Sequence, residues 1–324
     1  MAYDPDPSPR PDLDDTGAYN NSHRAFLQAF LSHSVLTADE IKPILAAVLS
    51  AHEGRPMLEG DITAPDISQY VTAVNSRLSS LDLEIRSTRS QTDRTLIYAL
   101  VNTTSDPLTQ LATTRTPDEI SYVKRVLDAM FETNNTRSRE IMAVSSVEAA
   151  NLAKVGRNRQ SNANEDGEEA SQAKNLSLNE AEKVLQECVE EGWFLRSRAG
   201  YYSLAPRALM ELRALLKETY NEPPDPEDAE DEGVTRIRDC EGCREIVTVG
   251  QRCSDRECGC RLHDHCTQQF FRNQTGERKC PKCKEEWTGN SFVGEKVVTR
   301  TRPSGRGSGA GPSRRTDETA DLED

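Results

Sequence analysis

Residues 240–283 read CEGCREIVTVGQRCSDRECGCRLHDHCTQQFFRNQTGERKCPKC and hold eight of the nine cysteines of the chain. Seven of these cysteines and one histidine fall into four pairs, with the spacings C-x2-C, C-x4-C, H-x2-C and C-x2-C. Structural zinc takes four tetrahedral ligands from thiolate and imidazole, and one short turn such as C-x2-C offers two of them. The pattern therefore predicts a segment that folds around two zinc ions.

The order of the pairs predicts which residues bind each ion. In a RING-type cross-brace the first and third pairs bind one zinc, and the second and fourth pairs bind the other. The ligands would be Cys240, Cys243, His263 and Cys266 for the first zinc, and Cys253, Cys258, Cys280 and Cys283 for the second. Cys260 could replace Cys258, and His265 could replace His263. We favour Cys258 and His263, because H-x2-C suits one tetrahedral ion better and a free cysteine packs well as a small buried side chain.

A disulfide framework is the alternative interpretation of these cysteines. The first twenty residues are acidic and rich in proline rather than signal-like, and disulfides persist mainly in oxidising compartments. We therefore expect reduced thiols that bind metal, in the cytosol or nucleus. The segment is too short to build a stable core alone, so zinc would supply about 10–16 kcal/mol of folding free energy per site.

Composition excludes several other classes of protein. The chain has 324 residues, of which 29% are charged and 5% aromatic, and its formal net charge is −14. This favours several modest cores over one large core, and an acidic chain is not a general nucleic-acid binder. No apolar run approaches the roughly 18 residues that a membrane span requires, so we expect no membrane contact.

Upstream of the cysteines, two successive regions have the element order of a winged helix. Three helical patterns, the second opened by the capping signature Thr37-Ala-Asp-Glu40, precede a period of two at residues 81–86 and an apolar run at 96–101. Similar capping signatures begin at Thr116, Ser145 and Ser177, and residues 193–204 form a second hairpin pattern. Helices followed by a hairpin predict two tandem winged-helix domains.

The expected fold class is α+β, with two tandem winged-helix domains, a small two-zinc RING-like cross-brace domain and disordered termini. The expected segments are a disordered tail at 1–20, winged-helix domain A at 21–106, winged-helix domain B at 107–220 with a flexible insertion at 156–174, an acidic linker at 221–236, the C4HC3 zinc domain at 237–290 and a disordered tail at 291–324.

The zinc pattern fits both a RING and a PHD finger, which share the C4HC3 order. PHD fingers typically carry tryptophan two residues before the seventh ligand, where this chain has Arg278. The last knuckle, Cys280-Pro-Lys-Cys283, is instead typical of RING domains, where the proline commonly helps to contact a ubiquitin-conjugating enzyme. This favours a RING-like domain and leaves a PHD-like reader of histone tails as an alternative.

Four stretches make a family resemblance specific. They are His23-Arg-Ala-Phe-Leu-Gln28, Tyr98-Ala-Leu-Val-Asn102, Asn179-Glu-Ala-Glu-Lys-Val-Leu-Gln186 and Cys258-Gly-Cys-Arg-Leu-His263 with Cys266. Together they resemble the family named non-structural maintenance of chromosomes element 1, over roughly residues 22–289. The family has a nonligand residue at the position of Cys260, which supports Cys258 as the ligand.

The resemblance implies a RING-type E3 ubiquitin ligase (a transferase of the ubiquitin conjugation pathway) in the nuclear SMC5-SMC6 complex, which acts in DNA repair and recombination. It implies a MAGE-type subunit bound to the winged helices, a neighbouring kleisin subunit, and a ubiquitin-conjugating enzyme positioned by the zinc domain. Such a ligase forms no covalent intermediate, so we expect no catalytic residue. The first zinc loop carries Glu241 and Gly242 where many RINGs have an apolar residue. Ligase activity would therefore depend on the partner, and a non-catalytic architectural subunit is the alternative.

For Cys188 and for the arginines near the expected wings, we prefer a structural role to a catalytic or DNA-binding one. Cys188 shares an apolar helical stripe with Val184 and Val189, so we expect a core residue rather than a reactive thiol. Arginines flank both expected wings, at Arg86, Arg89, Arg94, Arg196 and Arg198. Winged helices can bind DNA through such residues, but at this net charge we expect at most weak DNA contact and mainly protein contacts.

Overall fold

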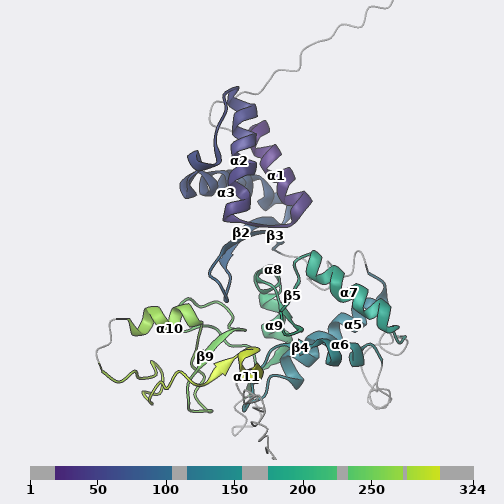
Figure 1. Ribbon diagram of the computed structural model, residues 1–324, viewed down its shortest axis with the longest axis vertical. Coiled ribbons are helices and arrows are strands. Elements are labelled where there is room, and N and C mark those ends of the chain that lie inside the picture. The colour runs from purple at the N-terminus through teal and green to yellow at the C-terminus, as the bar shows by residue number, and fades with distance from the viewer. Residues whose placement is uncertain (1–18, 104–114, 155–173, 225–232, 273–275, 300–324) are drawn as a thin grey trace, which may run out of the picture.

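The computed structural model describes residues 19–103, 115–154, 174–224, 233–272 and 276–299. The expected tail at 1–20 and the expected insertion at 156–174 lie almost wholly outside these ranges. The described part contains both helices and short antiparallel sheets, arranged in three bodies (Figure 1). None of the helices in these ranges combines the length and the apolar character that crossing a bilayer requires.

The first body is winged-helix domain A. Its elements are α1 (Asn21–His33), β1 (Val35–Thr37), α2 (Ala38–Glu53), η1 (Glu59–Asp61), α3 (Ala64–Leu78), η2 (Ser79–Leu81), β2 (Leu83–Arg89) and β3 (Leu96–Asn102). The strands pair antiparallel in the order β1-β3-β2. Phe26, Phe30, Ile41, Leu45 and Val74 are fully buried between the helices and the sheet. The alternation of apolar and polar residues begins at Leu83 rather than at the expected Leu81, because Leu81 lies in η2 and is exposed.

The second body is winged-helix domain B. Its elements are α5 (Pro117–Asp128), the π-helical turn η3 (Ala129–Thr133), β4 (Val144–Ser145), α6 (Ser146–Leu152), α7 (Leu178–Glu190), β5 (Phe194–Arg196), β6 (Tyr201–Leu204), α8 (Pro206–Glu211) and α9 (Arg213–Tyr220). Its strands pair in the order β4-β6-β5, so both bodies have three short antiparallel strands packed against helices. The buried residues of α5 are Tyr122, Val123, Val126 and Leu127.

The capping signatures mark where the helices begin. At α2, α5 and α7 the Thr or Ser side chain accepts from the backbone N–H three residues on, and the Glu side chain there accepts from the cap's backbone N–H. At α6 only the bond to Ser145 forms. These reciprocal bonds satisfy helix-end donors that would otherwise lack partners. The local sequence therefore sets these helix starts.

The third body is the zinc domain. Its elements are β9 (Gly250–Arg252), β10 (Arg261–Leu262), α10 (Asp264–Phe271), β11 (Phe292–Val293) and α11 (Lys296–Thr299), with the sheet order β10-β9-β11. The structure differs here from the expected boundary at 290, because β11 pairs with β9 and residues 291–299 continue this body. The ends of the expected linker also differ, since β7 (Asn221–Glu222) pairs with β8 (Val234–Thr235).

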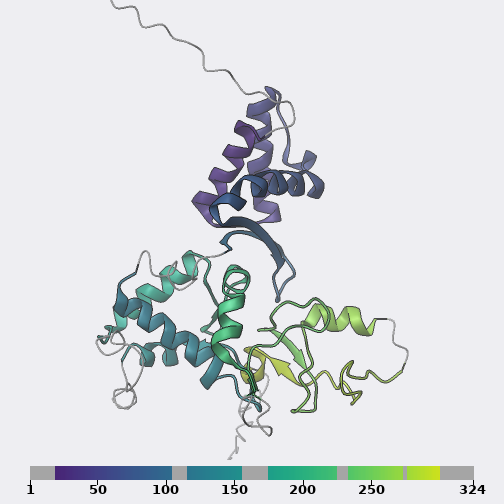
Figure 2. The same cartoon turned by 180° about the vertical axis from the view of Figure 1, so that it is seen from behind.

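The bodies are joined unequally. Domain B and the zinc domain share one continuous buried cluster, whereas domain A has a cluster of its own. The β2–β3 hairpin of domain A, its wing, extends from that body towards the zinc domain (Figures 1 and 2). The described chain is thus an α+β protein with two tandem winged helices followed by a RING-like zinc domain.

Candidate metal centres

The structure gathers eight side chains into two groups of four. One group is Cys240, Cys243, His263 and Cys266, and the other is Cys253, Cys258, Cys280 and Cys283. Within each group the ligand atoms all lie within 4.8 Å of one another. The first group joins the first and third pairs and the second joins the second and fourth, which is the arrangement of a cross-brace. Three thiols with an imidazole, and four thiols, are donor sets of structural zinc, so the domain accommodates two zinc ions.

Two knuckles of the same geometry present half of these side chains. At Cys240 the backbone N–H donates to Glu245 O, and Arg244 N–H returns a bond to Cys240 O. Around Cys280 the same two bonds are made with Glu285 and Lys284. Arg244 and Lys284 have positive φ, 65° and 67°, which closes each turn so that both thiols face inward.

Each knuckle favours ionisation of its first thiol, whereas burial raises the pKa of Cys243, the second thiol of the first knuckle. Burial opposes ionisation of Cys240, but hydrogen bonds, among them those from the backbone N–H groups of Cys243, His263 and Gly242, lower the pKa of its thiol to about 6. At Cys280 burial is likewise outweighed, here by the N–H groups of Cys283 and Lys282, and the pKa is about 7. Zinc binds thiolate rather than thiol. Each site therefore contains one residue already disposed to bind metal near neutral pH.

His263 is oriented by a backbone carbonyl. Its Nε2 lies 3.2 Å from Ile246 O, and since a carbonyl only accepts, Nε2 must carry the proton. Nδ1 then faces the first group, 3.2 Å from Cys243 Sγ. A histidine ligand held in one tautomer by such a bond is typical of metal sites. His265 stacks on His263 with ring centroids 5.2 Å apart and lies outside the group.

The two remaining cysteines are buried in the core. Cys260 is fully buried, and it lies outside both groups. Cys188 is also fully buried on α7, where burial raises the pKa of its thiol to about 12. A thiol that stays protonated at neutral pH is a poor nucleophile. The interpretation of Cys188 as a core residue agrees with this environment.

Glu140, from domain B, anchors the second zinc loop. It is buried, its Oε2 accepts from Arg261 Nε at 2.7 Å, and its Oε1 accepts from Arg252 Nη1 at 2.9 Å and from Arg261 Nη2. Arg261 also donates to the carbonyls of Cys258 and Cys260. The Glu140 carboxylate thus holds strands β9 and β10 together. Through Arg261 it also holds the backbone of Cys258, which belongs to the second group of four.

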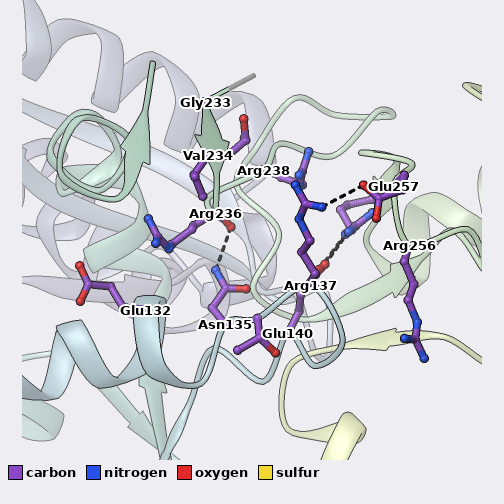
Figure 3. A pocket seen from close by; sticks show the side chains of 13 residues that line it. Glu132, Asn135, Arg137, Glu140, Gly233, Val234, Arg236, Arg238, Arg256 and Glu257 are labelled. Atoms are coloured by element: carbon purple, nitrogen blue, oxygen red, sulfur yellow. Dashed lines mark hydrogen bonds and ion pairs between the residues drawn. The ribbon is translucent and has the colours of Figure 1, made fainter. Parts of the chain in front are cut away.

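A pocket of about 390 Å³ opens beside Glu140 and is rich in arginine. In Figure 3, Arg238 lies next to Arg137, which forms an ion pair with Glu257 at 3.2 Å. A zinc ion with four thiolates carries a formal charge of about −2, and the pocket includes residues on both sides of the ligand Cys258. Arg238 interacts electrostatically with Cys258, so it would offset part of this negative charge.

Gln91 lies at the tip of the β2–β3 hairpin of domain A and bonds to residues that follow Cys243, a member of the first group. Its Oε1 accepts from Thr248 N–H at 3.0 Å, Val249 N–H at 2.9 Å and Thr248 Oγ1 at 3.2 Å, while its Nε2 donates to Ile246 O at 2.8 Å. Ile246 O is the same carbonyl that orients His263. Neither Gln91 nor Glu140 belongs to a motif, so neither could be identified from the sequence.

The fold and the two metal centres define a class, the tandem winged-helix proteins that end in a RING-like zinc domain. Comparison with known families is more specific. Residues 23–212 match the family model described as Nse1 non-SMC component of SMC5-6 complex, and residues 240–283 match the model of a RING-like domain. The chain belongs to this Nse1 family, which confirms the resemblance of its motifs, and its zinc domain is RING-like rather than a PHD finger.

Individual relatives agree with this assignment. The chain is 26% identical to the non-structural maintenance of chromosomes element 1 homologs of Rattus norvegicus and Homo sapiens, over 84% of this chain and 85% of each relative. It is 22% identical to the element 1 protein of Schizosaccharomyces pombe, over 70% of this chain. A chain in a solved Nse1-Nse3-Nse4 complex has the same fold, with a TM-score of 0.63, 23% identity and coverage of 83% of this chain and 97% of that chain.

Proposed function

We propose that this chain is the RING-type E3 ubiquitin ligase subunit of an SMC5-SMC6 complex that acts in DNA repair in the nucleus. The observation that carries the proposal is a cross-brace RING-like domain, built into the same core as a winged helix of the Nse1 family. The family name supports the complex, and the RING-like fold supports the ligase. The zinc ligands would be the two groups of four. The domain limits would be as expected, except that β7 and β8 occupy the ends of the linker and that the zinc domain extends to Thr299.

The ligase would act by positioning. It would hold a ubiquitin-conjugating enzyme so that a substrate lysine attacks the thioester, without any nucleophile of its own. Phe270, on α10, supports such docking because its aromatic side chain is 40% exposed. Large exposed apolar side chains are typical anchors of protein interfaces. Pro281, in the last knuckle, is the second residue that would contact the conjugating enzyme. Glu241 and Gly242 give the first zinc loop no apolar anchor for that enzyme, so a partner subunit would have to raise the ligase activity.

The winged helices would mainly contact protein. A MAGE-type subunit and a kleisin subunit are the partners that the Nse1-Nse3-Nse4 complex suggests. The wing tip of domain A is already engaged by the zinc domain through Gln91, which favours protein contact over insertion into a DNA groove. Arg86 pairs with Glu84, and Arg196 lies over the Tyr202 ring. DNA contact would be weak, and it would fall steeply with salt.

A reconstituted ubiquitination assay tests the ligase proposal. We expect chain formation with a panel of conjugating enzymes, stronger when the MAGE-type partner is present. Phe270→Ala should reduce the rate several-fold without loss of zinc, whereas Cys280→Ala should abolish activity because it removes a ligand of the second site. Val147→Ala, which removes an exposed apolar side chain of α6, is the matched control and should behave as wild type.

The same assay separates the ligase from an architectural subunit. Wild-type chain that binds its partner but yields no chains with any conjugating enzyme would contradict the ligase proposal. That result would favour a RING-like domain that only docks a neighbouring subunit. Equal activity of wild type and Phe270→Ala would leave the ligase in place and refute the docking role of Phe270.

A further inference from the structure

The wing of domain A touches the zinc domain at one well-defined point. Gln91 uses both ends of its side-chain amide there, in four hydrogen bonds to Ile246, Thr248 and Val249. Open space lies on both sides of this contact. A pocket of about 290 Å³ separates Ser87–Arg89 from Cys243 and His263, and another of about 410 Å³ lies beyond Thr92. The wing thus meets the zinc domain through a narrow contact rather than a packed interface.

Such a contact can open without unfolding either body. Domain A has its own buried cluster, separate from the cluster that unites domain B with the zinc domain. The wing strands β2 and β3 also pack on α8 of domain B, so only the tip has to leave the zinc domain while this packing holds the base of the wing. Lifting the tip would cost the hydrogen bonds of one amide, and each bond contributes a modest net free energy once water replaces it. The wing tip therefore has the properties of a two-state element that a ligand of domain A could bias.

The carbonyl of Ile246 connects this contact to the metal. It accepts from Gln91 Nε2 and also from His263 Nε2, so its two lone pairs hold the wing tip and the imidazole in one arrangement. Ile246 also bridges to Asp239, which closes the first knuckle next to Cys240. Loss of the Gln91 contact would leave His263 with a less firmly held partner, and outer-shell partners of this kind strengthen metal binding.

We propose that Gln91 is a positioning residue that links domain A to the first zinc site. A protein partner that binds domain A and restrains the wing would stabilise residues 246–249, and with them the orientation of His263 and the first zinc loop. This rests on the proposed ligase function, because the first zinc loop would then face the conjugating enzyme in a fixed position. The ligase activity would then depend on the partner because of the Gln91 contact, and the partner would not need to add a residue to the surface of the RING-like domain.

Hydrogen–deuterium exchange of the zinc-loaded full-length chain tests the link. In Gln91→Ala the amides of Thr248 and Val249 lose their acceptor, and they should exchange about tenfold faster or more. Release of one of the two zinc ions to a chelator should accelerate as well. Thr92→Ala is the matched control, since Thr92 lies in the same turn and, within the part of the chain that the structure describes, its side chain bonds only to Ser90. Exchange and zinc release that are equal in the two variants would overturn the proposal.

Addition of the MAGE-type partner then tests whether Gln91 transmits the effect of partner binding from domain A to residues 246–249. We expect the partner to slow exchange at residues 246–249 in wild type and in Thr92→Ala. In Gln91→Ala it should bind more weakly, by the factor with which it favours the docked wing, and when saturating it should still fail to slow this exchange or to raise the rate of chain formation. A Gln91→Ala chain that responds like wild type would refute the inference. A chain that binds no partner would contradict the proposed function instead, and the exchange of the free chains would still decide the role of Gln91.

Discussion

Glu140 is a single side chain on which the junction of domain B and the zinc domain depends. It is buried between Arg252 and Arg261, whose side chains are also buried. Replacement by alanine would leave two buried guanidinium groups without their carboxylate, and breaking a buried ion pair costs about 3–5 kcal/mol. Chemical denaturation of Glu140→Ala should show a loss of this size, with the zinc domain affected first.

An exposed pair nearby provides the control for Glu140. Arg137 and Glu257 also bridge domain B and the zinc loop, but their side chains are 77% and 72% exposed. Solvent and salt screen such pairs, and removing one typically costs about 1 kcal/mol or less. If Glu257→Ala were as destabilising as Glu140→Ala, burial would not be the cause of the effect at Glu140.

At the scale of an element, the start of α2 makes stability depend on pH. The Thr37 backbone N–H and then its hydroxyl donate to Glu40, and both bonds lower the pKa of that carboxyl. A lowered pKa stabilises the fold at pH values above the unfolded pKa, and this contribution disappears as the pH falls through the folded pKa. Thr37→Val should cost about 1 kcal/mol at neutral pH through loss of the cap.

The measurement for Thr37 is denaturation at neutral pH and at about pH 3, where carboxylates are largely protonated. The difference between wild type and Thr37→Val should shrink at the lower pH, because protonated Glu40 no longer accepts these bonds as an anion. A destabilisation of the same size at both pH values would show that the hydroxyl acts on the backbone N–H of Glu40 alone. Asp39→Asn, which changes another carboxylate in the first turn of α2, is the comparison.

At the scale of the whole molecule, the shared core predicts how the chain responds to metal removal. Chelation should unfold the zinc domain, because its sheet and short helix depend on the ion for much of their folding free energy. Domain B shares its buried cluster with the zinc domain and should lose protection too, whereas the separate core of domain A should keep it. Hydrogen exchange with and without chelator, followed by return of zinc, measures this. Uniform loss across all three bodies would contradict the division into two clusters.

The features that could be predicted from the sequence are local ones. Ligand pairs three or five residues apart, and capping residues three apart, fix their own geometry wherever the segment lies in the fold. The contacts that the sequence analysis missed are all distant along the chain. Gln91 and Ile246 are 155 residues apart, and Glu140 and Arg261 are 121 apart. Isolated Gln and Glu residues have no spacing that reveals such partners.

The sequence by itself determined the two zinc sites, their cross-brace order, the helix starts and the order of winged helix, winged helix and zinc domain, because each depends on neighbouring residues and a short repeat of polarity. Only the tertiary structure decided that domain B and the zinc domain share one core, that residues 291–299 complete the zinc sheet, and that the wing tip reaches the carbonyl of Ile246. Those features depend on how separately folded bodies pack, and packing brings together side chains that carry no mutual signal along the chain.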